Sequence, residues 1–129
     1  MNRSEFEKFI SNTYGVIAEH PWFRYASYAV YRHKSNNKWF AVVMDIPKAK
    51  LGIDSEDEIS IVNLKCDPIL IDTLVEEDGF FPAYHMNKVN WISVALDGSV
   101  EKEALIKLLG MSYNTTKKTK SNKNVFSSQ

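Results

Sequence analysis

The sequence has 129 residues, the size of one domain, and 44% of them are hydrophobic, which is enough for a core without disulfides or a structural metal. The formal net charge is zero, which argues against a protein that binds nucleic acids or membranes through its overall charge. One cysteine, short apolar runs and a polar first segment argue against an internal disulfide, a membrane span and a signal peptide, so we expect a cytoplasmic protein without membrane association.

The chain begins with a predicted amphipathic helix. Asn2 or Ser4 can cap it, and Ser4 has the capping-box spacing to Glu7. Positions that recur at helical spacing fall on one face, namely Phe6, Phe9, Ile10 and either Thr13 or Tyr14. Gly15 is expected to end the helix, and His20-Pro21 forces an extended connection.

Three strands are predicted to follow the first helix. Segments 28–33 and 39–45 flank a polar turn at 34–38, which makes a hairpin with a basic tip. A loop over 46–57 leads into the third strand at 58–64. Because the three strands are consecutive and two of them form a hairpin, the pattern favours an antiparallel sheet.

The second half alternates helix, strand and helix. Asp67 is a predicted N-cap with Pro68 at the first helical position, and Gly79 is expected to close this helix. Its buried stripe is predicted to be Leu70, Ile71, Leu74 and Val75. A strand is expected at 91–96, and Ser99 is the predicted cap of a last helix. The inner face of that helix is predicted to be Leu105, Leu108, Leu109 and Ser112.

Apolar periodicity stops near Thr115. Residues 115–129 carry four lysines and no acidic residue, so we predict a disordered, Lys-rich tail. The domain then spans residues 1–114 and has a negative charge balance. The order of elements predicts a compact α+β domain, with N-terminal, middle and C-terminal helices packed on the sheet.

The sequence contains no nucleotide-binding or nucleophile motif. His20, His33 and His85 stand far apart, so we expect no metal, no cofactor and no enzymatic activity. His33 beside the basic hairpin tip is expected to be exposed. The acidic runs 54–58 and 76–78 lack a calcium-loop pattern and are expected to be solvated surface.

The basic residues suggest a function. Five of them lie on the first hairpin and the next turn: Arg32, Lys34, Lys38, Lys48 and Lys50. Tyr31 and Trp39 lie among them. Basic side chains on hairpin tips can contact DNA phosphates, while nearby aromatic rings can stack on bases. The alternative is an ordinary hairpin whose charges prevent aggregation.

Two stretches, residues 82–88 (PAYHMNK) and 91–94 (WISV), together resemble the signature of the MmcQ/YjbR family. Residues 63–68 (NLKCDP) and 111–113 (MSY) also match that family, and the resemblance covers roughly residues 3–118. It implies a frataxin (CyaY)-like α+β fold. It also implies a double-wing DNA-binding arrangement, in which hairpins act as the wings.

The same segment contains residues with other possible roles. Pro82 suits a sheet edge or a bend, and Trp91 is expected to bury its ring against a helix. Lys65, His85 and Lys88 are the candidates for a binding pocket, with an entry into a strand as the structural alternative.

We therefore predict a non-enzymatic, cytoplasmic DNA-binding module. Binding is expected to be weak and non-specific, because the contacts would be to phosphates and the body of the domain is net acidic. Two alternatives stay open at this point. One is a small protein-interaction or scaffold domain without nucleic-acid binding, and the other is a small-ligand pocket around Lys65, His85 and Lys88.

Overall fold

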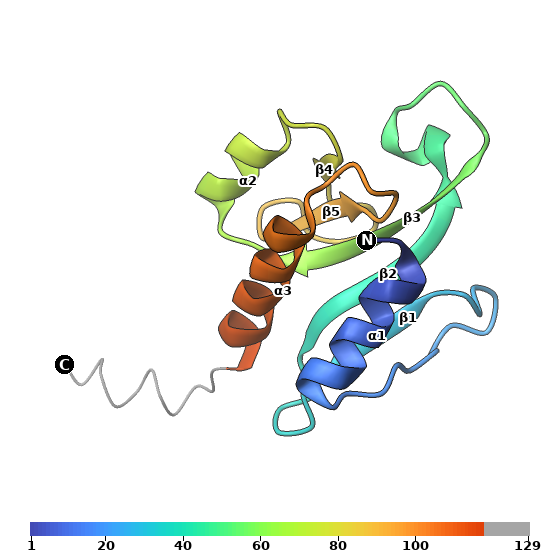
Figure 1. Cartoon of the computed structure of the whole chain (residues 1–129). Coiled ribbons are helices and arrows are strands. Elements are labelled where there is room, and N and C mark those ends of the chain that lie inside the picture. The colour runs from blue at the N-terminus through green and yellow to red at the C-terminus, as the bar shows by residue number, and fades with distance from the viewer. Residues whose placement is uncertain (118–129) are drawn as a thin grey trace.

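The computed structural model describes residues 1–117, which form three α-helices and a five-stranded sheet. The elements are α1 (Arg3–Tyr14), β1 (Ala29–Arg32), β2 (Trp39–Pro47), the 3-10 helix η1 (Lys48–Leu51), β3 (Glu58–Lys65), α2 (Pro68–Leu74), β4 (Phe80–Pro82), β5 (Trp91–Ala95) and α3 (Lys102–Lys117). All strand pairs are antiparallel, in the order β1-β2-β3-β5-β4 (Figure 1). The predicted α+β class is confirmed, while the frataxin (CyaY)-like comparison stays a prediction. None of the helices in the described part is long and apolar enough to cross a bilayer.

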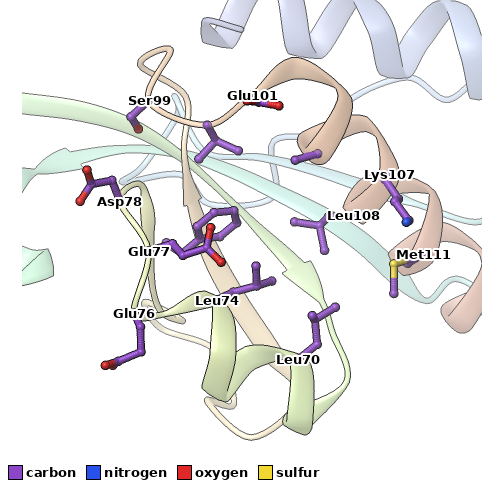
Figure 2. A pocket seen from close by; sticks show the side chains of 13 residues that line it. Leu70, Leu74, Glu76, Glu77, Asp78, Ser99, Glu101, Lys107, Leu108 and Met111 are labelled. Atoms are coloured by element: carbon purple, nitrogen blue, oxygen red, sulfur yellow. The ribbon is translucent and has the colours of Figure 1, made fainter.

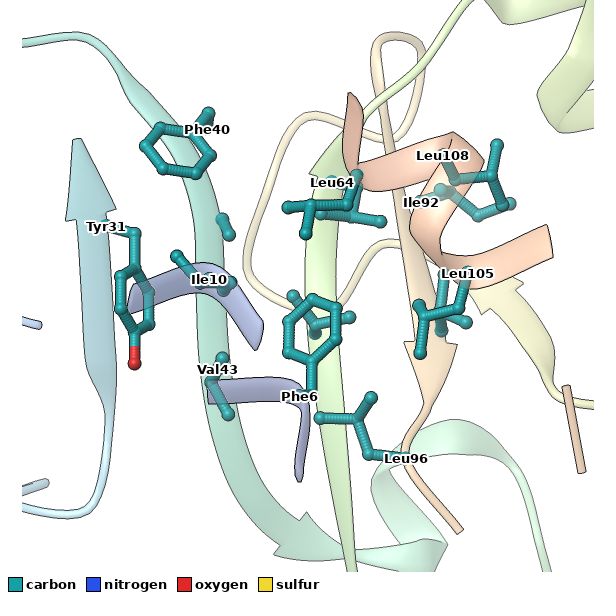
Figure 3. Close-up of a cluster of buried hydrophobic side chains, with 14 of the residues drawn as sticks. Phe6, Ile10, Tyr31, Phe40, Val43, Leu64, Ile92, Leu96, Leu105 and Leu108 are labelled. Carbon is teal, nitrogen blue, oxygen red and sulfur yellow. The ribbon is translucent and has the colours of Figure 1, made fainter. Parts of the chain in front are cut away.

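The main core lies between the helices and one face of the sheet. Phe6 and Ile10 of α1 and Leu105 of α3 are almost fully buried and point at the sheet (Figure 3). Leu109 of α3 is fully buried in the same cluster. The sheet residues that meet them are Ala29, Tyr31, Phe40, Ala41, Val43, Val62, Leu64, Ile92 and Val94. We call this side of the sheet, which the helices cover, the helical face.

Asn2, one of the two predicted N-cap residues, caps α1. Asn2 Oδ1 accepts a hydrogen bond from the Glu5 amide (2.9 Å), and Glu5 Oε1 accepts one from the Asn2 amide (2.9 Å). The capping box is therefore Asn2–Glu5, and the predicted Ser4–Glu7 box is wrong. Glu7 instead pairs with Arg3 one turn away (2.9 Å).

The middle helix begins as predicted but ends early. Asp67 Oδ1 accepts from the Ile69 amide (2.8 Å), with Pro68 next to the cap. α2 ends at Leu74, so the predicted closure at Gly79 is wrong. Gly79 (φ 88°) lies in the turn before β4, where a Cβ would come within 2.5 Å of Val100 Cγ2. The glycine is needed for this close approach.

Three further boundaries differ from the sequence prediction. The short edge strand β4 was missed, although Pro82 does lie at the predicted sheet edge. Ser99 does not cap α3, which begins at Lys102; its hydroxyl donates to Asp97 (2.6 Å). The predicted tail boundary at Thr115 falls inside α3, which continues to Lys117, and residues 118–129 of that tail lie outside the described residues.

A β-bulge joins the sheet to α3. Tyr31 pairs with Ala41 and Arg32 pairs with Trp39, so Phe40 is the extra residue of β2. The Phe40 carbonyl accepts from Ser112 Oγ (2.6 Å), and the same Oγ accepts from the Lys65 amide (2.9 Å). One buried hydroxyl of α3 therefore satisfies two backbone groups at the end of the β2–β3 ladder.

This arrangement predicts that Ser112→Ala lowers the free energy of unfolding. A buried backbone group without a partner costs about 1–3 kcal/mol, and the change removes the partner of two such groups. Urea unfolding of Ser112→Ala measures the loss, with Asn114→Ala, an exposed polar residue of the same helix, as the control. Equal stability of the two variants would show that the Phe40 carbonyl and the Lys65 amide find other partners.

Candidate functional site

The sheet face opposite the helices carries a second, smaller buried cluster. Its members are Val30, Val42, Met44, Ile46, Ile59, Ile61 and Ala95. Trp22 and Tyr28 of the α1–β1 connection and Tyr84 of the β4–β5 connection pack against it. None of the three α-helices contributes to this cluster, which only Leu51 of the short helix η1 touches, so we call this side the open face.

An aromatic pocket of about 350 Å³ opens on this face. It is lined by Trp22, Tyr25, Tyr28, Trp39, Met44, Tyr84, His85 and Met86. The Trp22 and Trp39 rings meet edge to face with their centroids 5.6 Å apart, and Tyr25 stacks on Tyr28 at 4.8 Å. Offset and edge-to-face contacts are the favoured geometries of aromatic rings, so the walls support one another.

The bulge at Phe40 gives Trp39 its place in the pocket. Phe40 and Ala41 are consecutive, yet both belong to the core of the helical face. Side chains alternate along a regular strand, so the extra residue shifts the alternation and directs Trp39 to the open face. The contact of Ser112 with the bulge therefore also supports the pocket.

Two buried polar residues fix the loop that carries Tyr84. Asn63 of β3 and Ser93 of β5 are register partners and are fully buried. Ser93 Oγ accepts from the Tyr84 amide (2.9 Å) and donates to Asn63 Oδ1, while Asn63 Nδ2 donates to the Tyr84 carbonyl (2.9 Å). Both polar groups of the Tyr84 backbone are thus paired with the sheet below.

His85 at the rim has a strained backbone. Its φ is 58°, in the left-handed region that favours glycine, and its ring lies 4.2 Å from that of Tyr84. Such conformations cost about 1–3 kcal/mol and are concentrated at binding and catalytic sites. The strain therefore marks this rim as a candidate contact.

Tyr28 stays protonated in the pocket. Burial raises the pKa of Tyr28, and the nearby phenols of Tyr84 and Tyr25 and the carboxylate of Asp45 raise it further. Tyr28 therefore presents a neutral ring and an O–H group at neutral pH. The pocket offers aromatic faces and weak polar groups, which suit a flat, uncharged ring system.

The three residues predicted to line a pocket do not line one together. His85 belongs to the aromatic pocket, whereas Lys88 is exposed on the loop that follows. The Lys65 ammonium lies 5.7 Å from the centre of the Trp91 ring. Trp91 is only half-buried, and alternation from Ser93 places it on the open face, so the prediction that it packs against a helix is wrong.

The five basic residues predicted for DNA binding are also separated. Arg32 is paired with Glu19 at the sheet edge (Nε to Oε2, 2.7 Å), which raises the pKa of Arg32 and lowers that of Glu19. Lys34 and Lys38 are exposed at the β1–β2 tip. Lys48 follows the other end of β2, about 30 Å away along the strand.

The second predicted wing carries more acidic than basic side chains. Lys48 and Lys50 lie in η1, and the loop that follows contains Asp54, Glu56 and Asp57. The Lys48 amide donates to the Asp57 carbonyl (2.8 Å), which holds this loop against η1. The structure therefore does not bring the five basic residues onto one positively charged surface.

His33 is buried, and the prediction that it is exposed is wrong. Only 3% of its surface is accessible, and Nε2 lies 2.8 Å from Thr116 Oγ1. The Thr116 hydroxyl donates to the Ser112 carbonyl (2.7 Å), so its oxygen accepts from Nε2. Asn36 Nδ2 donates to the Thr116 carbonyl (2.9 Å), so the hairpin tip caps the end of α3.

The remaining titratable side chains give no metal site in residues 1–117. No group of three or more His, Cys, Asp or Glu side chains there could hold an ion. Asp54, Glu56 and the run Glu76–Asp78 are exposed, as predicted. Cys66 is buried, and burial raises the pKa of its thiol.

Sequence reasoning missed most of the aromatic pocket. Trp39 and Tyr31 were singled out with the basic hairpin, but Tyr31 faces the helices and only Trp39 lines the pocket. Trp22 and Tyr25 lie in a connection without periodicity. Asn63 and Ser93 could have indicated part of the site from the sequence. Each is a polar residue in the middle of a buried strand, so each needs a buried hydrogen-bond partner.

Comparison with known proteins gives consistent matches along the chain. The YjbR family model matches residues 11–115. The chain is 37% identical over 117 residues to the uncharacterized protein YyaQ of Bacillus subtilis (strain 168), covering 91% of this chain and 99% of that protein. A crystal structure of a Pseudomonas syringae protein has 38% identity and a TM-score of 0.89, covering 91% of this chain and 100% of that one. A Deinococcus radiodurans protein of 24% identity shares the fold, with a TM-score of 0.67 and coverage of 91% and 80%.

The burial of His33 predicts a loss of stability on mild acidification. Burial, with smaller effects of Lys117 and Lys38, lowers the pKa of His33 below the 6.5 of an ordinary histidine. The unfolded chain therefore binds this proton more readily, and the free energy of unfolding falls as the pH drops through about 6.5. Urea unfolding between about pH 7.5 and 5.5 measures the slope.

His33→Gln keeps a hydrogen-bonding side chain but cannot titrate, so its slope should be flatter than that of the wild type. His20→Gln removes an exposed histidine and leaves the His33 contribution in place. Equal slopes in wild type and His33→Gln would contradict the assignment.

Proposed function

The chain belongs to the YjbR family, and we propose that it is a non-enzymatic DNA-binding module that holds an unpaired base of single-stranded DNA in the aromatic pocket. The observation that carries the proposal is the pocket itself, where indole and phenol rings converge on the open face of a sheet. Base stacking on aromatic side chains contributes about 1–3 kcal/mol per base and tolerates any sequence.

The size of the pocket favours one ring system over a duplex. Its volume of about 350 Å³ lies near the lower end of small-molecule sites, which span about 300–1,000 Å³. Bases in a duplex are stacked on each other and do not present their faces. The pocket therefore suits a base that has already left the stack, or a free nucleoside of the same shape.

Cations near one end of the pocket support contacts with the DNA backbone. Lys38 precedes Trp39 in the chain and is exposed, whereas Arg32, the register partner of Trp39, is already paired with Glu19. Lys65 lies on the same face beside Trp91. Two phosphate contacts on a single strand, by Lys38 and Lys65, correspond to a slope of log affinity on log salt of about −1.4, at about −0.7 per contact.

Duplex binding by two hairpin wings has less support. Lys34 and Lys38 lie at one end of β2, and Lys48 and Lys50 at the other beside three carboxylates. A duplex that touched both tips would meet this acidic loop. Binding of a base in the aromatic pocket needs neither Lys48 nor Lys50, so it avoids contact with this acidic loop.

A second candidate function is recognition of a protein partner. The connection that carries Trp22 and Tyr25 also exposes Phe23 (99%) and Ile17 (80%). Large apolar side chains exposed together on one loop are typical of contact surfaces. Phe23 does not line the aromatic pocket, so the two functions can be separated by mutation.

Tyr25→Ala is predicted to weaken the binding of single-stranded DNA. Loss of one stacking ring corresponds to a dissociation constant about 5- to 150-fold higher. Tyr25 is 53% exposed, so the melting temperature should stay close to that of the wild type. Quenching of tryptophan fluorescence by an oligothymidylate of about ten nucleotides measures the affinity.

Phe23→Ala is the matched control, because it removes an exposed ring of the same loop that lies outside the pocket. It should bind the oligothymidylate like the wild type. Equal affinity for duplex and single strand, or no quenching at low salt, would contradict the proposal. Quenching by thymidine as strong as that by the oligonucleotide would favour the small-ligand alternative.

A further inference from the structure

A second concave surface lies on the other side of the molecule, between α2 and α3. This α2–α3 groove has a volume of about 820 Å³ (Figure 2). Its apolar lining consists of Leu70, Leu74, Phe80, Val100, Ala104, Leu108 and Met111. In Figure 2, Leu70 and Leu74 of α2 face Leu108 of α3 across the groove. Met111 is 38% exposed, so part of this apolar surface is in contact with solvent.

The groove is bordered by uncompensated acidic side chains. Glu76, Glu77, Asp78 and Glu101 line it together with a single basic residue, Lys107. Within residues 1–117 the ion pairs are Arg3–Glu7, Arg3–Asp45 and Arg32–Glu19, so none of these four carboxylates is paired there. An apolar groove with an acidic border is complementary to a segment that combines lysines with a few apolar side chains.

We propose that the occupant is the C-terminal segment of the same chain, residues 118–129. Its charged residues are Lys118, Lys120 and Lys123, and Val125-Phe126 is its only pair of apolar residues. In the proposed arrangement the two apolar side chains enter the groove, and the lysines lie against its acidic border. The ligand class is thus a short basic peptide with an apolar end, supplied by the protein itself.

The length of the segment is sufficient for this arrangement. An extended chain advances about 3.3–3.6 Å per residue, so Phe126 can lie up to about 30 Å from Lys117. The groove runs beside α3, and the distance from Lys117 back to Lys102 is about 22 Å at 1.5 Å per residue. Phe126 can therefore reach any part of the groove.

Because residues 118–129 are covalently attached to α3, weak contacts are sufficient to keep them in the groove. A segment tethered next to its site is present at an effective concentration in the millimolar range, so even a low intrinsic affinity keeps the groove occupied. A second copy of the chain would have to compete with this local concentration. The chain's own segment is therefore favoured over an equivalent segment from another molecule.

Amide NMR spectra of the full-length chain test the proposal. The variant Val125→Asp/Phe126→Asp removes the apolar anchor, and Ser127→Asp/Ser128→Asp adds the same charge at neighbouring positions. We expect amide shifts of groove residues, such as Leu74, Ala104 and Met111, to change in the first variant. The second variant should leave them close to the wild-type values.

A charge reversal on the groove provides a second, independent test. Glu77→Lys should release the segment, whereas Glu103→Lys, an exposed residue of α3 outside the groove, should not. Release is detected as narrow, motionally averaged signals of residues 118–129. Narrow signals already present in the wild type, or groove shifts identical in the two Asp variants, would overturn the proposal. Groove shifts that disappear on dilution would assign the occupant to a second copy and overturn it equally.

Discussion

The fold depends on one hydroxyl group at the place where a strand, a bulge and a helix meet. Ser112 Oγ of α3 donates to the Phe40 carbonyl and accepts from the Lys65 amide, so one backbone group of each strand at the end of the β2–β3 ladder is paired with the helix. A bulge leaves backbone groups without ladder partners, and buried groups of this kind are costly. α3 therefore supplies a hydrogen-bond partner for the carbonyl of the bulge residue Phe40.

The bulge gives the two sheet faces different roles. Phe40 turns toward the helices and joins the main core, while Trp39 turns to the open face and lines the aromatic pocket. The same helix continues beyond Ser112 to Thr116, which pairs with His33 at the start of the hairpin turn. Packing on the helical face thus determines the position of a side chain in the candidate site on the other face.

Local features were predictable from the sequence because their causes lie within a few residues. The Asp67–Pro68 helix start, the strand at 91–95 and the glycine end of α1 all follow from short-range rules. The position of His33 was not predictable, since its partner Thr116 is 83 residues away. For the same reason the end of the last helix was predicted too early. Its final residues are polar, and their contact with the first hairpin, which lies far away in the sequence, could not be foreseen.

The aromatic pocket combines segments that share no sequence pattern, because Trp22 lies in an aperiodic connection and Tyr84 is fixed by two buried side chains of other strands.

The most direct test of the role of the aromatic pocket is to follow the indole N–H signals of the three tryptophans while single-stranded oligothymidylate is added. If the pocket binds a base, the Trp22 and Trp39 signals shift together, and the same amount of duplex leaves them in place. Unchanged Trp22 and Trp39 signals, with a shift of Trp91 alone, would contradict base binding in the aromatic pocket.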